Sequence, residues 1–208
     1  MKIAVLANNV LKEEFLSKKI PAAIELRIVD SFSQFFFIKD ADVYFDLEFE
    51  MNKDRIQQLH SFLPKPVFIN SVINTLDEIK EPFIRINAWP TFLKRNICEI
   101  VAHENEKKIA TEILDKLEWR YQFTPDEPGM ISARIIVMII NEAYYTFEDN
   151  VSTKNEIDIA MKLGTNYPYG PFEWSEKIGL KNIYNLLLRL SKTETRYTIS
   201  KIMEKEVN

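Results

Sequence analysis

The distribution of glycine is the feature of this sequence that most constrains its fold. All four glycines (Gly129, Gly164, Gly170 and Gly179) lie after residue 128, and the first 128 of the 208 residues contain none. Average usage of about 7% would place roughly nine glycines in that stretch. Phosphate-binding loops of the dinucleotide type and of the P-loop type need glycine where the backbone approaches a phosphate. Residues 1–128 therefore cannot contain either loop.

Composition and charge exclude several classes of protein. A hydrophobic content of 46% with 28% charged residues predicts a folded globular chain. The net charge of -4 offers no basic field, so we expect no nucleic-acid partner. The longest apolar run, Ile135–Ile140, is too short for a membrane span, and residues 1–7 do not form a secretory signal. The single cysteine, Cys98, indicates a reducing cytoplasm and no internal disulfide. We find no metal-ligand motif.

The first half of the chain alternates between strand and helix patterns. Short apolar runs predict strands at 2–6, 25–29, within 40–50, 66–70, 82–87 and 95–101, and apolar residues at helical spacing predict helices at 11–20, 52–62 and 104–117. Strands separated by helices of this length predict a mainly parallel sheet that is covered on both faces.

The second half reads as helices only. The segment Thr124-Pro-Asp-Glu-Pro-Gly129 marks a boundary, so we predict domains at 1–123 and 124–208. Thr153 and Glu156 form a capping box for a helix that ends at Lys162, with Gly164 just past its end. Further helices are predicted at 133–147, 171–178, 181–191 and 196–206. The first of these is apolar nearly all round, which is typical of a buried or interface helix.

Several motifs of the second half resemble the 3-hydroxyacyl-CoA dehydrogenase family. They are Asp126-Glu-Pro-Gly-Met-Ile-Ser-Ala-Arg134, Asn141-Glu-Ala143, Glu156-Ile-Asp-Ile-Ala-Met-Lys-Leu-Gly164 and Tyr167-Pro-Tyr-Gly-Pro-Phe-Glu173. The resemblance is strong over 125–190 and fainter over the first half. It implies an α/β then all-α fold: a shortened Rossmann-like parallel-sheet domain, then a helical domain that binds acyl-CoA and dimerises. It also implies NAD-dependent oxidation of a 3-hydroxyacyl-CoA.

The places that hold the family's phosphate-loop glycines are changed in this chain. Counted from the first strand, they fall on Ala7, Asn9 and Lys12. Asn9 can adopt a left-handed backbone but brings a side chain towards the pyrophosphate, and Lys12 is bulky where the helix packs on the sheet. Asp30 follows the second strand, where an acidic residue would hold a ribose, but without the glycine loop a solvated turn is the favoured interpretation. We expect no bound cofactor, and NAD only if an atypical site exists.

The catalytic base implied by the resemblance is also missing. The family pairs a histidine with a glutamate twelve residues later, and here Glu99 takes the glutamate's place and Asn87 the histidine's. Ile86 is an alternative occupant of the base position. An asparagine amide donates and accepts hydrogen bonds but takes no proton at neutral pH. Glu99 can instead be a plain ion-pair partner of Lys94 or Arg95.

The substrate contacts implied by the family are retained only in part. Asn70 and Ser71 remain at the end of a predicted strand, but the family's serine falls near Val72. Ala133 stands where the family has an asparagine, and Arg134 follows it. We name Asn70, Ser71, Ala133 and Arg134 as candidate substrate-binding positions.

Three hypotheses follow from these substitutions. The first is a 3-hydroxyacyl-CoA dehydrogenase-like protein whose NAD-dependent activity is weak or lost, with a residual acyl-CoA-binding or regulatory role. The second is an active oxidoreductase of the family with an atypical cofactor site, and the third is a structural partner subunit. His60 and His103 are predicted to be surface residues, so neither replaces the base. We expect a homodimer through the helical domain, although the helix at 133–147 can also be buried within one subunit.

Overall fold

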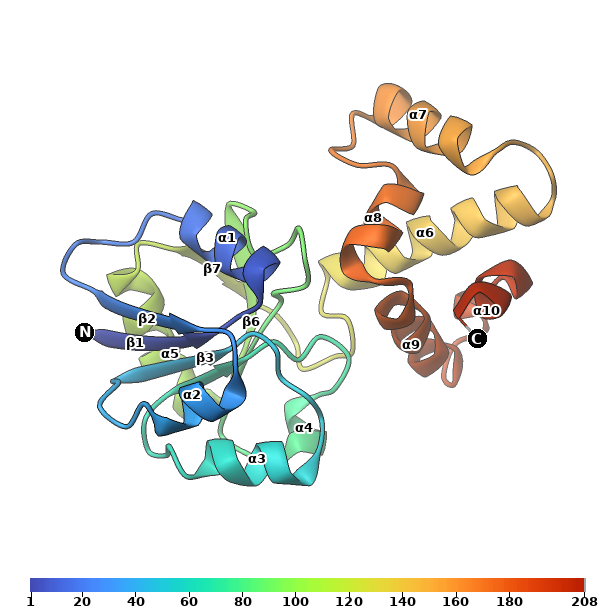
Figure 1. Cartoon of the computed structure of the whole chain (residues 1–208). Helices are drawn as coiled ribbons and strands as arrows, with labels where there is room; N and C mark the ends of the chain where they lie inside the picture. The colour runs from blue at the N-terminus through green and yellow to red at the C-terminus, as the bar shows by residue number, and fades with distance from the viewer. Residues whose placement is uncertain (208) are drawn as a thin grey trace. The chain divides into compact units, whose positions relative to one another are not determined.

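The chain folds into two compact units. The structure is a computed structural model and describes residues 1–207. The first unit is Met1–Met130, an α/β sheet domain, and the second is Ile131–Asn208, which is helical (Figure 1). The sequence places a domain limit seven residues earlier than this division, after residue 123. Residues 124–130 stay with the first unit because the guanidinium of Arg85 holds the Asp126 carboxylate and the backbone carbonyl of Glu127.

The first unit is built on a seven-stranded sheet with the order β2-β1-β3-β4-β5-β6-β7. Its strands are β1 (Lys2–Leu6), β2 (Glu25–Val29), β3 (Val43–Asp46), β4 (Val67–Ile69), β5 (Ile84–Ile86), β6 (Ile97–Val101) and β7 (Arg120–Phe123). All neighbouring strands are parallel except β5 and β6, which pair antiparallel. The chain passes from one side of β1 to the other after β2, so the topological switch point lies between β1 and β3.

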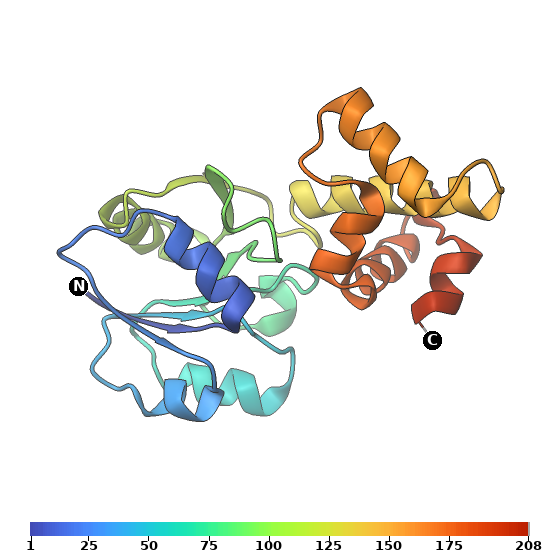
Figure 2. The same cartoon turned by 45° about the horizontal axis from the view of Figure 1, so that its top comes forward.

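Helices cover both faces of this sheet. Helices α1 (Asn9–Ser17) and α5 (Glu104–Lys116) pack on one face, and α2 (Phe32–Phe37), α3 (Lys53–His60) and α4 (Leu76–Ile79) pack on the other, as Figure 2 shows. Alternate residues of each strand point to opposite faces, so both faces of a central strand need apolar cover. Phe35 of α2 is fully buried, and most of the aromatic cluster at 32–37 belongs to this cover.

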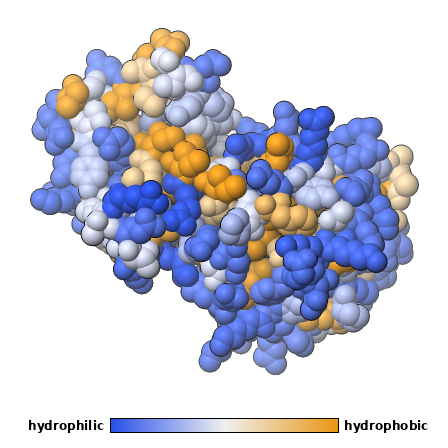
Figure 3. All heavy atoms as spheres, turned by 180° about the vertical axis from the view of Figure 1, so that it is seen from behind, coloured by the Kyte–Doolittle hydropathy of each residue, from blue (hydrophilic) through white to orange (hydrophobic). Residues whose placement is uncertain are grey.

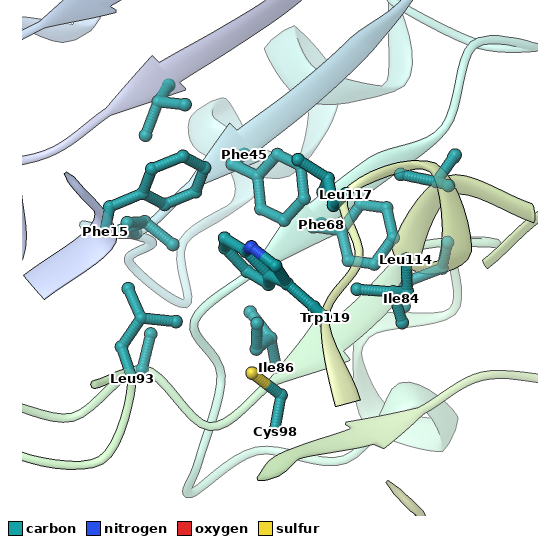
Figure 4. Packing of buried hydrophobic residues seen from close by; sticks show 14 of the residues in the cluster. Phe15, Phe45, Phe68, Ile84, Ile86, Leu93, Cys98, Leu114, Leu117 and Trp119 are labelled. Atoms are coloured by element: carbon teal, nitrogen blue, oxygen red, sulfur yellow. The ribbon is translucent and has the colours of Figure 1, made fainter. Parts of the chain in front are cut away.

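The core on the α1 side is centred on Trp119. Figure 4 shows its indole ring among Phe15, Phe45 and Phe68, with Cys98 at the edge of the cluster. Burial of its thiol raises the pKa of Cys98 above the usual range, so this cysteine packs as a small apolar residue.

The second unit is a set of helices with one short 3₁₀ turn. They are α6 (Ser132–Glu148), α7 (Lys154–Thr165), α8 (Pro171–Ile178), α9 (Leu180–Ser191), the 3₁₀ turn η1 (Thr195–Tyr197) and α10 (Lys201–Val207). Helix α6 buries Ala133, Val137 and Ile140 on one face. The tight passage from α8 to α9 runs through Gly179, whose φ of +90° a residue with a side chain rarely adopts.

Much of the Tyr-Pro-Tyr-Gly-Pro-Phe-Glu motif builds the start of α8. Asp158 of α7 accepts hydrogen bonds from the backbone N–H groups of Phe172 and Glu173, at 2.8 and 3.1 Å, and so caps α8 from a neighbouring helix. A Cβ at Gly170 would collide with that Asp158 side chain. Lys162 pairs with Glu173, which also accepts from the Gly170 N–H. The motif therefore fixes the geometry of α7 and α8.

The fold class is confirmed, and the differences from expectation are local. Helices α2 and α4 and strand β7 were not predicted. Gly164 lies within α7 instead of past its end, because Asn166 takes the left-handed C-cap position with a φ of +55°. The helix predicted at 196–206 is interrupted, because Asn141 binds the backbone of Thr198 and Ser200. No helix within residues 1–207 is long and apolar enough to cross a membrane.

The second unit exposes a group of apolar side chains. Figure 3 shows apolar atoms gathered over part of this unit. Leu163 of α7 is 83% exposed and Ile135 of α6 is 57% exposed, and Ile131, Ile159 and Leu188 are also exposed. Monomeric soluble domains rarely expose large apolar patches, and such patches commonly mark an interaction surface.

Candidate functional site

The predicted pair Asn87 and Glu99 meets at the carboxyl end of β5. Asn87 follows β5 and lies opposite Glu99 in the antiparallel β5–β6 ladder, and its backbone N–H donates to the Glu99 carbonyl. The Asn87 side-chain amide donates to the Glu99 carboxylate over 3.1 Å. A hairpin of this length brings residues twelve apart face to face, which explains the spacing. Ile86, the alternative base position, is fully buried in the core.

The Asn87 side chain is buried with one polar atom available. It is 2% exposed, and its carbonyl oxygen, Oδ1, has no hydrogen-bond partner within residues 1–207. A buried acceptor without a partner carries a desolvation cost of about 1–3 kcal/mol. This oxygen can accept a hydrogen bond from a ligand hydroxyl but cannot take its proton.

Asn70 and Ser71 serve the fold at this edge of the sheet. The Asn70 amide donates to the carbonyls of Leu47 and Ala88, and its Oδ1 accepts from the Ala88 N–H over 3.0 Å. The Ser71 hydroxyl donates to the Asn74 carbonyl. These contacts tie the ends of β3, β4 and β5 together. A substrate-binding role for Asn70 and Ser71 stays a prediction.

Helix α1 holds the loop that follows β5. The buried Glu14 carboxylate accepts from the backbone N–H of Thr91 over 2.6 Å, and Lys18 donates to the Arg95 carbonyl over 2.8 Å. Thr91 has a φ of +82°, a conformation that β-branched residues avoid. The loop residues Ala88 and Leu93 are fully buried in the core under α1. No sequence pattern predicts this contact, because a glutamate at this position is typical of a helix surface.

The amino end of α1 is capped by the side chain of the residue that precedes it, Asn8. The Asn8 side chain accepts from the Leu11 N–H over 3.1 Å, and α1 begins directly at Asn9. Asn9 has a negative φ, so the left-handed turn considered for it is not adopted. Lys12 is exposed instead of facing the sheet, where Leu11 and Phe15 pack. The amide groups that would meet a pyrophosphate are thus partly engaged by the protein.

The residues at this edge do not fit a dinucleotide. Asp30 is exposed at the end of β2, where a ribose would lie, but the segment 7–12 has no glycine, and the start of α1 is already capped by the Asn8 side chain. A cofactor-binding role for Asp30, Asn9 and Lys12 stays a prediction. We therefore derive no chemical step through NAD.

A buried ion pair at the end of β3 was missed from the sequence. Asp46 is fully buried, and Arg55 Nε lies 2.8 Å from its carboxylate. Burial raises the pKa of Asp46 to about 7, against the opposing effect of the Arg55 guanidinium. A carboxylate at the carboxyl end of a buried parallel strand, beside the switch point, is the signal that marks this position.

Of the candidate positions of the second unit, Ala133 is buried and Arg134 is partly exposed. Ala133 is fully buried on α6. Arg134 donates to the Tyr197 hydroxyl over 3.1 Å and pairs with Glu194, so it holds the segment before α10. Their substrate contacts stay predictions.

Both histidines lie away from the Asn87 position. His60 ends α3 and lies 2.7 Å from the Glu81 carboxylate, and His103 precedes α5 with an exposed side chain. Neither histidine lies at the position where the resemblance implies a base.

The comparison with protein families identifies the helical part of the chain. Residues 129–208 match the family model of the 3-hydroxyacyl-CoA dehydrogenase C-terminal domain. A 3-hydroxybutyryl-CoA dehydrogenase of Clostridioides difficile is 31% identical over 117 residues, which are 53% of this chain and 42% of that relative. The chain thus spans less than half the length of this curated relative. The resemblance drawn from the sequence motifs is confirmed.

Solved structures extend the likeness to the fold of the whole chain. The (S)-3-hydroxybutyryl-CoA dehydrogenase of Ralstonia eutropha superposes with a TM-score of 0.72 at 15% identity, covering 99% of this chain and 93% of that one. A pyridine-carboxylic acid 5-dehydrogenase described as an NAD⁺-dependent dismutase gives a TM-score of 0.63 at 15% identity, covering 92% and 79%. The chain therefore has a dehydrogenase-like, Rossmann-like fold.

Proposed function

We propose, on the premise that residues 129–208 match the 3-hydroxyacyl-CoA dehydrogenase C-terminal domain, that this chain is a dehydrogenase-like protein of acyl-CoA metabolism with weak or lost NAD-dependent activity. Its residual role is either to bind an acyl-CoA or to act in regulation. The observation that carries the proposal is Asn87, which is hydrogen-bonded to Glu99 at the place of the base.

The amide of Asn87 can bind a substrate hydroxyl but cannot act as the base that turnover needs. Oxidation of a 3-hydroxyl group needs a group that accepts the hydroxyl proton as the hydride leaves. Asn87 can hold that hydroxyl through its unpartnered Oδ1, while Glu99 fixes the amide so that Oδ1 faces away from the carboxylate. This arrangement supports ligand binding without proton transfer.

Thermal unfolding in the presence of acetoacetyl-CoA tests the binding role. A ligand at a hundred times its Kd stabilises the folded state by about 2.7 kcal/mol, so the melting temperature should rise with concentration. Asn87→Ala should weaken the effect, and Glu13→Ala, an exposed change on α1 at a position with no proposed binding role, is the control. No shift at high ligand excess would favour a structural partner subunit instead.

Fluorescence titration with NADH tests the loss of cofactor binding. We expect no saturation at micromolar NADH. Saturation in that range would contradict the proposal and favour an active enzyme with an atypical cofactor site. The two titrations therefore separate the three hypotheses.

We also propose that the chain forms a homodimer through its helical unit. The exposed apolar residues of α6 and α7 support this, among them Ile135 and Leu163. The resemblance implies the same arrangement.

A further inference from the structure

The orientation of the Asn87 amide is fixed by the chemistry of its neighbour. The Asn87 amide nitrogen donates to the Glu99 carboxylate over 3.1 Å, and the Asn87 backbone N–H donates to the Glu99 carbonyl. An ionised carboxylate only accepts hydrogen bonds, so a flipped amide would set two acceptor oxygens against each other. The amide therefore keeps its nitrogen towards Glu99 and presents Oδ1 on its other side.

The Oδ1 atom of Asn87 is a buried acceptor that the protein leaves unsatisfied. The side chain is 2% exposed, and no group within residues 1–207 donates to this oxygen. Buried polar atoms nearly always have a partner, so an acceptor without one points to a donor from outside the chain. Asn70, which binds the backbone of the next residue, Ala88, is partly exposed, so Asn87 lies close beneath the surface of the unit.

The donors beside this strand end are already used within the protein. The Asn70 amide donates to two backbone carbonyls, and the Ala88 N–H donates to the Asn70 side chain. The Ser71 hydroxyl donates to a backbone carbonyl over 2.9 Å. A ligand oxygen that reaches Asn87 Oδ1 thus meets an acceptor, and these neighbours offer it no compensating donor.

A hydroxyl and a ketone differ in what they offer to such an acceptor. A hydroxyl donates a hydrogen bond, whereas a ketone oxygen only accepts one and would face Oδ1 as a second acceptor. A site that binds a ligand hydroxyl in this way rejects an analogue without the hydrogen, because the buried polar group is then left unpaired. Histidine would behave differently at this place, because its charged form donates and its neutral form can accept.

We infer that Asn87 is a specificity-determining residue, which makes this site bind the 3-hydroxyacyl form of a CoA thioester in preference to the 3-ketoacyl form. The inference rests on the proposed acyl-CoA role and adds to it the oxidation state of the ligand. The site holds the alcohol without oxidising it, because the amide takes no proton.

Calorimetric titration of the full chain with 3-hydroxybutyryl-CoA and with acetoacetyl-CoA tests this inference, because the two ligands differ only at C3. We expect a Kd at least about tenfold lower for 3-hydroxybutyryl-CoA, which is the size of effect that one unpaired buried group causes. Butyryl-CoA, which has no oxygen at C3, should also bind more weakly than the alcohol.

Two substitutions of Asn87 identify the group that makes the choice. Asn87→Leu replaces the amide with an apolar group of similar size, so the ratio of the two Kd values should fall to about one. Asn87→His should make this ratio depend on pH between about 6 and 8, with acetoacetyl-CoA favoured when the imidazole is charged. The control is Asn96→Leu, at an exposed asparagine of the loop before β6, which should keep the ratio of the unchanged chain.

The possible failures separate this inference from the proposed function. Equal Kd values for the alcohol and the ketone would overturn the inference and leave the acyl-CoA role standing. A preference that persists in Asn87→Leu, or that Asn96→Leu also removes, would overturn it as well, because another group would then distinguish the ligands. Absence of binding by all three thioesters would overturn both proposals.

Discussion

Single buried polar side chains determine which contacts can form at the carboxyl ends of the strands. Asn87 lies where the resemblance implies a base and binds Glu99, Glu14 fixes the loop after β5, and Asp46 pairs with Arg55 beside the switch point. Each one is polar and buried, so each needs a partner and fixes the geometry of that partner.

Replacing Asn87 with histidine tests the assignment of the missing base. Asn87→His introduces a group that can take up and release a proton near neutral pH, so that its charged form can donate the proton that the ketone oxygen needs when hydride is added, and the neighbouring Glu99 carboxylate favours that charged form. We expect NADH-dependent reduction of acetoacetyl-CoA to rise above the background of the unchanged chain when NADH is at millimolar concentration. Asn87→Gln, which keeps an amide, should show no gain. Equal rates in both variants would contradict the assignment.

Glu14 should control the order of the loop after β5. Glu14→Ala removes the acceptor of the Thr91 N–H, so amide hydrogen exchange at Thr91 should accelerate and unfolding should become easier by about 1.5–3 kcal/mol. Glu14→Gln keeps an acceptor and should restore much of the protection. Glu13→Ala, an exposed neighbour, should change stability by no more than about 0.5 kcal/mol.

Asp46 should leave a signature in the pH dependence of stability. Because burial raises its pKa to about 7 in the folded state, the folded chain binds more protons than the unfolded chain between about pH 4 and 7. This group therefore lowers the free energy of unfolding as the pH rises through that window. Urea unfolding of Asp46→Asn at several pH values should show a flatter profile, differing by no more than about 1.4 kcal/mol per pH unit. Parallel profiles would contradict the shift.

At the level of elements, the two glycines of the α7–α8 region have opposite roles. Gly170 leaves room for the Asp158 cap of α8, whereas Gly164 has open space around it inside α7. The motif at 156–164 contains Gly164 and the motif at 167–173 contains Gly170, and the sequence alone does not distinguish their roles.

A pair of alanine substitutions measures this difference. Gly170→Ala forces Asp158 away from the start of α8 and should destabilise the helical unit by about 1–3 kcal/mol. Gly164→Ala should stabilise α7 by up to about 1 kcal/mol, because alanine is the better residue within a helix. Thermal unfolding of both variants checks the prediction, and a loss of stability in Gly164→Ala would contradict it.

Most of the strands and helices could be predicted from regular patterns in the sequence. The strands β1 and β4 follow apolar runs, and β2, β5 and β6 follow short patterns in which apolar and polar residues mix. Helices α5, α6 and α8 have clear caps or long apolar faces. The short helices α2 and α4 exist because the sheet needs cover, which is a tertiary demand that a local pattern does not record. The same holds for the break at 198–200, where Asn141 on a distant helix captures the backbone.

In the candidate site, too, contacts set by local spacing could be predicted, and contacts between residues far apart in the sequence could not. The spacing predicted that Asn87 and Glu99 form a pair, and they are in contact, because an antiparallel ladder determines which residues face each other. The contacts of Glu14 with Thr91 span 77 positions, and those of Arg85 with Asp126 span 41. No local spacing encodes such pairs, and they became visible only in three dimensions.

At the scale of the whole molecule, the exposed apolar face of the helical unit predicts association. Analytical ultracentrifugation should show a dimer, and Leu163→Glu should weaken it at least tenfold because a charge enters an apolar contact. Phe37→Glu is the control, since Phe37 is 77% exposed on α2 of the other unit. A protein that stays monomeric at every concentration would contradict the dimer.

The cap that Asn8 places on α1 also bears on any redesign of this segment. An amide group that donates to a side chain of the helix is not free to donate to a bound phosphate. Introducing glycine at Ala7, Asn9 and Lys12 would leave Asn8 in place and loosen α1 before any nucleotide could compensate. A single glycine substitution is therefore expected to cost stability with no gain of phosphate binding. A phosphate-binding loop at this helix start would need several changes at once, with the Asn8 cap among them.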